Sequence, residues 1–283
     1  MPIEAEKVRG AELPEVETQW TEDQVILYHL GIGAGDPPTE PSELSYVYEA
    51  NLKVLPTFAT IPPFMAMMGI AQLEGLDINP ALLLHGEHEI EVSGPLPPKA
   101  TATHRGRVAG LYDKGRVAVL VTEVTTLTDG EPLFVNRASL VLRGEGGFGG
   151  DKGPATPEDA PKRPPDHETT AKTLPQQALL YRLSGDRNPL HADPAFAALG
   201  GFDRPILHGL ATYGIVCKAV VDTMLEGDVG RVSGYRARFS GVVFPGETIV
   251  TRMWDEGNTV RIKAHTAERE ETVLSHSSLT VRP

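Results

Sequence analysis

The chain has 283 residues, of which 40% are hydrophobic and 23% charged, so it can bury a full core. Its net charge of −12 argues against a nucleic-acid-binding surface, because phosphates are neutralised by clustered Lys and Arg. Its single cysteine, Cys217, excludes an internal disulfide. The first residues are polar, and no run reaches the roughly 18 apolar residues of a membrane span. We therefore predict a cytoplasmic protein without a membrane or nucleic-acid partner.

The first half of the chain contains a short motif, an apolar stretch and a set of strands. Residues 28–37 read YHLGIGAGDP, and a proline-containing run then leads into residues 61–70, IPPFMAMMGI, for which we predict a long helix. Two later segments are rich in β-branched side chains and follow the turn signals DKG and DG: residues 116–124 and 134–142. This half therefore predicts a helix followed by an antiparallel meander.

The middle of the chain, residues 144–173, is dominated by Gly, Pro and charged side chains, and it shows no apolar periodicity. Such a segment cannot bury enough apolar surface to offset the entropy of ordering it, so we predict a linker. The linker divides the chain into a first domain, residues 1–143, and a second domain, residues 174–283.

The second half repeats the order of features seen in the first. Residues 181–189, YRLSGDRNP, correspond to the first motif, and residues 209–221 are apolar nearly all round, which predicts a helix buried on most of its surface. Three strand segments follow, at residues 248–254, 259–264 and 272–280. The fold class is therefore predicted as α+β, with one long helix wrapped by an antiparallel sheet in each half. The two sheets could pair edge to edge and remove an exposed edge.

The residues suited to chemistry concentrate in the segment YRLSGDRNPLHADP, residues 181–194. Asp186 and His191 are five apart and cannot share a helical face, and Pro189 pushes Asn188 out of the helical region. The segment must turn sharply, which could bring the carboxylate and the imidazole to one water and let them share its activation. On spacing alone, a turn-capping Asp beside a partly exposed His is the more common explanation.

The full string, residues 181–197, resembles the hydratase 2 signature of the MaoC-like dehydratase family, whose core is Gly-Asp-x-Asn-Pro-Leu-His. Further segments are similar to the same family: FDRPILHGL at 202–210, RFSGVVFPGET at 238–248, LHGEH at 84–88 and YDKGR at 112–116. The resemblance implies a double hot-dog fold with catalysis in the second half. In the first half no Asn-Pro-Leu-His follows the Asp-Pro of the first motif, so that copy is expected to be catalytically silent.

The resemblance also implies an activity and a set of catalytic residues. The reaction would be the reversible addition of water to trans-2-enoyl-CoA, giving (3R)-3-hydroxyacyl-CoA. Asp186 and His191 would activate the water, and which of them is acid or base stays open because a coupled pair titrates as a unit. Asn188 would orient the pair, or be a plain turn residue. The backbone N–H of Gly209 would face the thioester oxygen, or the glycine would serve close packing.

The expected substrate contacts lie mostly in the first half. His85, Gly86 and Lys114 would contact the acyl-CoA, although a solvated turn lysine is the simpler interpretation of Lys114. Phe239 would line the path of the substrate, although an aromatic in a strand more often belongs to the core. No cofactor and no metal are expected, since coenzyme A is part of the substrate. The resemblance suggests a homodimer.

Other functions fit the sequence less well. The run GIGAG at 31–35 lacks the spacing and the preceding strand of a dinucleotide loop, and no Gly-x-Ser-x-Gly elbow of a serine hydrolase occurs. Asp186, His191, Asp193 and His208 form no metal-ligand pattern, and we expect a structural role for His208. Two alternatives remain: a hot-dog thioesterase and a non-catalytic acyl-CoA-binding module.

Overall fold

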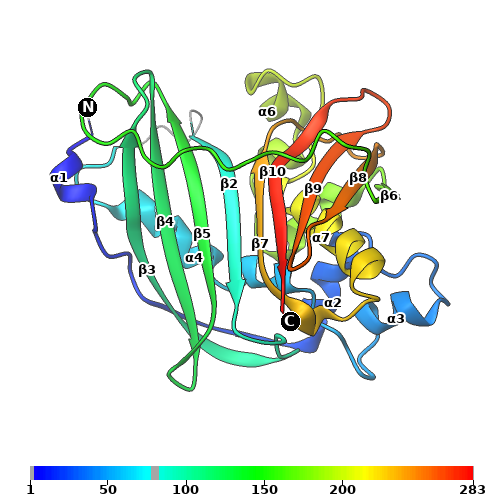
Figure 1. The fold of residues 1–283 in the computed structure, drawn as a ribbon. Coiled ribbons are helices and arrows are strands. Elements are labelled where there is room, and N and C mark those ends of the chain that lie inside the picture. The colour runs from blue at the N-terminus through cyan, green and yellow to red at the C-terminus, as the bar shows by residue number, and fades with distance from the viewer. Residues whose placement is uncertain (1–2, 78–82, 283) are drawn as a thin grey trace.

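A computed structural model describes residues 3–77 and 83–282 and shows one ten-stranded sheet with its helices (Figure 1). Neighbouring strands pair antiparallel in the order β1-β3-β4-β5-β2-β7-β10-β9-β8-β6. The strands are β1 (Val16–Trp20), β2 (Leu83–Val92), β3 (Ala100–Asp113), β4 (Val117–Thr128), β5 (Glu131–Arg143), β6 (His167–Lys172), β7 (Val232–Phe239), β8 (Thr248–Asp255), β9 (Thr259–Thr266) and β10 (Thr272–Val281).

The helices vary widely in length. The α-helices are α1 (Ala5–Val8), α2 (Glu22–Gly31), α3 (Pro41–Val47), α4 (Phe64–Met67), α5 (Gln177–Tyr181), α6 (Pro194–Leu199) and α7 (Gly209–Met224). Short 3₁₀ helices are η1 (Pro56–Thr60), η2 (Met68–Gln72), η4 (Arg182–Ser184), η5 (Pro189–His191) and η6 (Val229–Arg231). Helices α4 and α7 lie on the same side of the sheet in Figure 1. No helix in the described parts of the chain is long and apolar enough to cross a membrane.

The strand order shows that the chain is an internal duplication. Counted outward from the centre, one half runs β2, β5, β4, β3, β1 and the other runs β7, β10, β9, β8, β6. The halves meet where β2 pairs with β7, with Glu87 opposite Arg238 and Glu91 opposite Gly234. The predicted edge-to-edge pairing is therefore confirmed, and it removes an edge from each half-sheet.

Strand β6 corrects the predicted extent of the linker. It lies within residues 144–173, yet it pairs with β8 and occupies the same place in the second half that β1 occupies in the first. A polar strand is tolerated there because β6 is an edge strand whose residues are mostly exposed. The segment between β5 and β6 crosses the other face of the sheet, where Asp159 accepts a hydrogen bond from the backbone of His276 at 2.9 Å (Figure 1).

The first half does not contain the long helix predicted over residues 61–70. The chain there forms the four-residue α4 followed by the 3₁₀ helix η2. Pro63 stands at the N-cap of α4, and Gly69 lies so close to the next segment that a Cβ on it would be 2.9 Å from a ring carbon of Pro14. Because proline lacks a donor and glycine favours the unfolded chain, neither residue supports a longer helix at this place.

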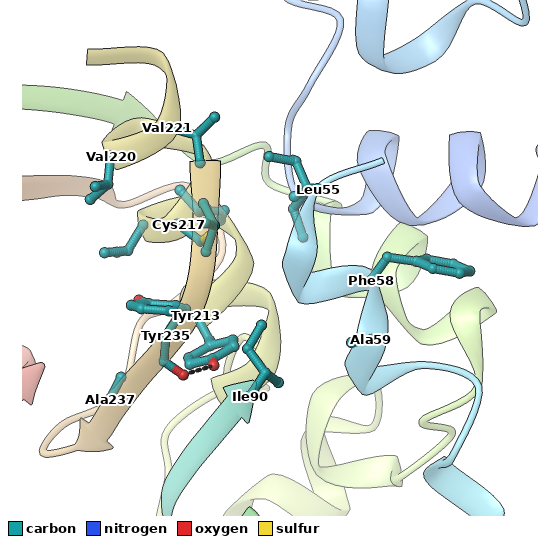
Figure 2. Packing of buried hydrophobic residues seen from close by; sticks show 14 of the residues in the cluster. Leu55, Phe58, Ala59, Ile90, Tyr213, Cys217, Val220, Val221, Tyr235 and Ala237 are labelled. Atoms are coloured by element: carbon teal, nitrogen blue, oxygen red, sulfur yellow. Dashed lines mark hydrogen bonds between the residues drawn. The ribbon is translucent and has the colours of Figure 1, made fainter. Parts of the chain in front are cut away.

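In the second half the predicted long helix is present as α7, and it lies at the centre of the larger of two apolar clusters. Figure 2 shows side chains of α7, of β2 and β7 and of η1 packed together. Tyr213 of α7 donates a hydrogen bond to the carbonyl oxygen of Tyr235 at 2.7 Å, which ties the helix to strand β7 (Figure 2). A helix that is apolar on nearly every side is stable because both the sheet and η1 cover it.

Polar side chains of the first half also bind side chains of α7. Lys218 is largely buried and donates to Glu43 of α3 at 2.5 Å and to Asp222 at 2.8 Å. The hydroxyl of Tyr46 donates to the second carboxylate oxygen of Asp222 at 2.7 Å. A buried ammonium group that meets two carboxylates keeps its charge compensated, so these contacts fix the orientation of α7 relative to the first half.

Gly214 permits the close packing of α7 against α2. A Cβ at this position would lie 2.7 Å from Oη of Tyr28 and 2.8 Å from Cγ2 of Ile32. We expect Gly214→Ala to lower the free energy of unfolding by about 1–3 kcal/mol, the usual cost of overpacking. Gly94→Ala is the matched control, because apart from its chain neighbours no atom of the described residues lies within 4 Å of its added Cβ. Equal stability of the two variants in urea unfolding would show that the helices are not in this close contact.

Candidate active site

A sharp turn places the predicted catalytic residues. Gly185 adopts φ of 138°, a backbone conformation that side chains disfavour, and it ends η4. Oδ1 of Asp186 then accepts the backbone N–H of Asn188 at 3.0 Å, and Oδ1 of Asn188 accepts that of Leu190 at 3.0 Å. Pro189 begins η5 with a backbone angle suited to the first helical position. The turn predicted from the sequence is therefore confirmed.

The turn brings three side chains together. One ligand atom each of Asp186, His191 and His208 lies within 4.8 Å of the others. His191 is 8% exposed, and its Nδ1 lies 2.9 Å from the carbonyl oxygen of Ile206. A carbonyl oxygen only accepts, so Nδ1 of a neutral His191 carries the proton and Nε2 presents a lone pair. The predicted pair thus offers two hydrogen-bond acceptors, a carboxylate oxygen and an imidazole nitrogen, to one small molecule.

His208 belongs to the same cluster, although we expected only a structural role. Its ring stacks on that of His191, with centroids 3.7 Å apart, and it lies 4.8 Å from the ring of Tyr181. Its Nε2 lies 3.2 Å from the backbone carbonyl oxygen of Asp186, and its buried Nδ1 has no hydrogen-bond partner among the described residues. In the sequence, the one signal that could have indicated this role is that His208 directly precedes the buried helix.

Burial keeps both imidazoles of the cluster neutral. The pKa of His191 is lowered mainly by burial, while the hydrogen bond to Ile206 and the charge of Asp186 act in the opposite direction. Burial lowers the pKa of His208 to about 3, and His191 adds to this effect. Burial also raises the pKa of the Tyr181 hydroxyl, with a further contribution from Asp186. Near neutral pH both rings are therefore uncharged, and each has a nitrogen lone pair that can accept a hydrogen bond.

Two predicted catalytic residues interact with backbone N–H groups or present one. Asn188 is exposed and its side-chain oxygen is used by the N–H of Leu190, so the side chain holds the turn. Gly209 is the first residue of α7, and no side chain caps this helix end. The first N–H groups of a helix have no partner within it, and they carry the positive end of the helix dipole. An oxyanion near Gly209 would be stabilised by the unpaired N–H groups and by the helix dipole.

Three of the predicted substrate contacts lie close to one another, and one of them, Phe239, lies beside Gly209. The ring of Phe239 would be 3.3 Å from a Cβ at Gly209, so a side chain there would require the ring to move by a few tenths of an ångström. His85 contacts the same phenylalanine edge to face, with centroids 4.9 Å apart. Gly86 forms a bulge in β2 and would place a Cβ 3.0 Å from Cγ2 of Val141. These residues come from β2 and β7, so both halves contribute to this part of the site.

The structure places Lys114 apart from this group, in the exposed turn between β3 and β4. The neighbouring Asp113 is 8% exposed and accepts the backbone N–H groups of Gly115, Gly147 and Gly149 at 2.6–3.0 Å. These hydrogen bonds lower the pKa of Asp113. They also hold the glycine-rich segment against the turn, which fixes the backbone on both sides of Lys114.

Asp186, His191 and His208 are the residues of this cluster that could hold a cation. Coordination of one ion would require the lone pairs of both imidazoles to converge on it. The rings instead stack with their planes 27° apart, and Nε2 of His208 faces a carbonyl oxygen. This arrangement favours a water molecule between Asp186 and His191 over an ion held by all three.

Comparison with known proteins identifies the family of this chain. The model of the MFE-2 hydratase 2 N-terminal domain matches residues 18–144, and that of the MaoC like domain matches residues 156–276. Enoyl-CoA hydratase ChsH3 of Mycobacterium tuberculosis is 46% identical over 97% of both chains. The chain belongs to the hydratase 2 branch of the MaoC-like dehydratase family.

Further relatives and solved structures show the same family and fold. The peroxisomal enoyl-CoA hydratase 2 of Arabidopsis thaliana is 42% identical over 93% of this chain and 91% of that protein. The crystal structure of a MaoC-like dehydratase from Phytophthora capsici superimposes with a TM-score of 0.90 at 33% identity, covering 99% of this chain and 98% of the other. A Mycobacterium tuberculosis protein described as a double hotdog fold matches with a TM-score of 0.62 at 12% identity, covering 99% of this chain and 98% of the other. The double hot-dog fold class is confirmed.

The contact between Asp186 and His191 predicts a measurable effect on the imidazole. Replacing the carboxylate with an amide in Asp186→Asn removes a charge that raises the pKa of His191, so this pKa should fall further below 6.5. An NMR titration of His191 measures the shift. Asp193→Asn is the control, because that carboxylate caps α6 through the N–H of Ala195. An unchanged pKa in Asp186→Asn would mean that the carboxylate does not face the imidazole.

Proposed function

We propose that this hydratase 2 family member is an (R)-specific enoyl-CoA hydratase, which reversibly adds water to trans-2-enoyl-CoA to give (3R)-3-hydroxyacyl-CoA. The observation that carries the proposal is the meeting of Asp186 and His191 as two acceptors for one water. The match to the hydratase 2 models and the name of the mycobacterial relative, an enoyl-CoA hydratase, support it.

In the proposed reaction a water donates one hydrogen bond to the carboxylate of Asp186 and one to Nε2 of His191. Its oxygen then has a lone pair free to attack C3 of the enoyl thioester. As the C–O bond forms, the water loses one proton to the pair, and a proton from the pair is added at C2. The net change is the addition of one water across the double bond, and the reverse steps dehydrate the product.

The first turn of α7 would stabilise the charge that develops during this reaction. Attack at C3 pushes electrons toward the thioester oxygen and forms an enolate. The backbone N–H of Gly209 would donate to that oxygen, and the helix dipole points its positive end there. A donor that is already in position is worth about 3–4 kcal/mol in comparable sites.

The substrate would reach this centre past residues of both halves. Phe239 and His85 would line the path beside Gly209, and Lys114 would meet a polar part of coenzyme A farther along the same sheet. The first-half motif ends at an exposed Asp36 and has no histidine turn after it, so this copy would take no part in the chemistry. The absence of a separate cofactor, the cytoplasmic location and the homodimer stay predictions.

The central test is Asp186→Asn, which keeps the shape of the side chain and removes a proton acceptor. We expect turnover of crotonyl-CoA to fall by about 10²–10⁴-fold, the usual contribution of a general acid–base group. The rate is followed through the absorbance of the enoyl thioester. Binding of butyryl-CoA, which cannot be hydrated, should persist.

Asp193→Asn provides the matched control seven residues away. Asparagine is as good an N-cap as aspartate, so the α6 cap and the turnover should both be retained. Near-normal turnover in Asp186→Asn would contradict the proposed mechanism, and equal losses in both variants would show that the turn, and not the carboxylate, was damaged.

The silent first half gives an independent prediction. Asp36→Asn should change turnover of crotonyl-CoA by no more than a few-fold, because this exposed carboxylate has no partner corresponding to His191. The same absorbance assay measures it, and the urea unfolding curve serves as the check on folding. Complete loss of turnover with an unchanged unfolding curve would show that the first motif takes part in catalysis.

A further inference from the structure

His208 joins the catalytic turn to the start of helix α7. Its ring is buried, and its Nε2 lies 3.2 Å from the backbone carbonyl oxygen of Asp186. Its own carbonyl oxygen accepts the first hydrogen bonds of α7, from the N–H groups of Ala211 at 3.1 Å and Thr212 at 3.2 Å. One residue therefore contacts both the turn that would activate water and the helix that would carry the oxyanion donor.

Two neighbouring rings hold the imidazole of His208 in its orientation. The ring of His191 stacks on it, with centroids 3.7 Å apart and planes 27° apart. The ring of Tyr181 packs against it with a centroid distance of 4.8 Å and an angle of 49° between the planes. A closely packed ring cannot turn without displacing its neighbours, so Nε2 of His208 stays directed at Asp186.

Asp186 depends on this contact because of the residue that precedes it. Gly185 has a φ of 138°, and a glycine restricts the backbone less than any other residue, so the turn alone does not fix the position of Asp186. Oδ1 of Asp186 accepts the backbone N–H of Asn188 at 3.0 Å. The N–H of His208 provides a second bond, at the backbone of Asp186. The two bonds together fix the direction of the carboxylate.

The same hydrogen bond determines which nitrogen of His208 carries the proton. A carbonyl oxygen only accepts, so Nε2 is the donor and Nδ1 of the neutral ring is bare. Burial lowers the pKa of His208 to about 3, and the neighbouring His191 adds to this effect. The ring is thus neutral near pH 7, with its proton on Nε2. His191 has the opposite tautomer, because its Nδ1 faces the carbonyl oxygen of Ile206.

His208 is also an unusual residue for the place that it occupies. It is the N-cap of α7, where Ser, Thr, Asp and Asn are preferred because their side chains accept N–H groups of the first turn. The side chain of His208 makes no such bond. A capping oxygen would occupy these N–H groups, whereas His208 leaves them to an anionic ligand beside Gly209.

We infer that His208 is a positioning residue that sets the distance between the carboxylate of Asp186 and the backbone N–H of Gly209. The inference rests on the proposed function, in which the carboxylate holds the attacking water and Gly209 binds the thioester oxygen. Attack at C3 requires both groups in place at once, and a misplacement of about 1 Å can cost about 100-fold in rate. Because this geometry matters as the C–O bond forms, loss of the N–H donor lowers kcat and leaves KM nearly unchanged.

Two exchanges of His208 separate the hydrogen bond from the packing. His208→Phe keeps an aromatic ring and loses the N–H donor. His208→Gln loses the ring and keeps a donor, since Nε2 lies as many bonds from Cβ in glutamine as in histidine. We expect kcat for hydration of crotonyl-CoA to fall about tenfold in His208→Phe, the value of one hydrogen bond, and to stay within a few-fold of wild type in His208→Gln.

A role in packing alone predicts the reverse order. In that case His208→Phe would retain kcat, and His208→Gln would lose it together with stability in urea unfolding. This reverse order would overturn the inference, and so would a wild-type kcat in both variants. His104→Phe is the matched control, because His104 is fully buried and bonds Thr18 and Thr126. We expect it to keep the wild-type kcat, whatever its stability.

The hydrogen bond can also be read on the wild-type chain, so that this test does not depend on the folding of a variant. In long-range ¹H–¹⁵N NMR spectra with ¹⁵N-labelled histidine, we expect His208 to be protonated at Nε2 and His191 at Nδ1. The variants His208→Gln and His191→Gln assign the signals. A His208 protonated at Nδ1 would overturn the inference. Absence of hydration by the wild-type chain would contradict the proposed function, while the spectrum would still show whether His208 donates to Asp186.

Discussion

The burial of helix α7 is the constraint on which the rest of this structure depends. The helix is apolar on nearly every side, so the sheet, η1 and the first-half helices must all cover it. At its first turn, backbone N–H groups have no partner within the helix. That turn lies beside Phe239 at the end of β7, next to the central pairing of β2 with β7. The packing of the helix therefore determines where both halves can meet a ligand.

Several buried imidazoles in this region are neutral, and each is hydrogen-bonded to a carbonyl or amide group. Ile206 determines the tautomer of His191, and Asn136 determines that of His88. In both cases burial lowers the pKa, so the lone pair that is left can accept a hydrogen bond near neutral pH. Backbone and side-chain amide groups do not titrate, and they determine which nitrogen of each titratable imidazole carries the proton.

The elements that the sequence predicted well are those whose patterns are local. The Asp129-Gly130 hairpin has both residues at positive φ, as its turn type requires, and α7 has the predicted apolar character on all sides. The helix predicted over residues 61–70 is wrong because Pro63 and Gly69 do not support a longer helix and because Gly69 packs against Pro14, a long-range contact. Strand β6 was missed because an edge strand can be polar. The relation of His85 to His88 depends on a bulge, which alternation of side chains along a strand does not reveal.

The most direct test of this account follows wild-type protein with crotonyl-CoA by the absorbance of the enoyl thioester, coupled to an R-specific 3-hydroxyacyl-CoA dehydrogenase. The account predicts that the absorbance falls and that the product is oxidised by the R-specific enzyme, without release of free coenzyme A. An absorbance that holds steady would contradict hydration at the Asp186–His191 pair, and release of free coenzyme A would instead indicate a thioesterase on the same fold.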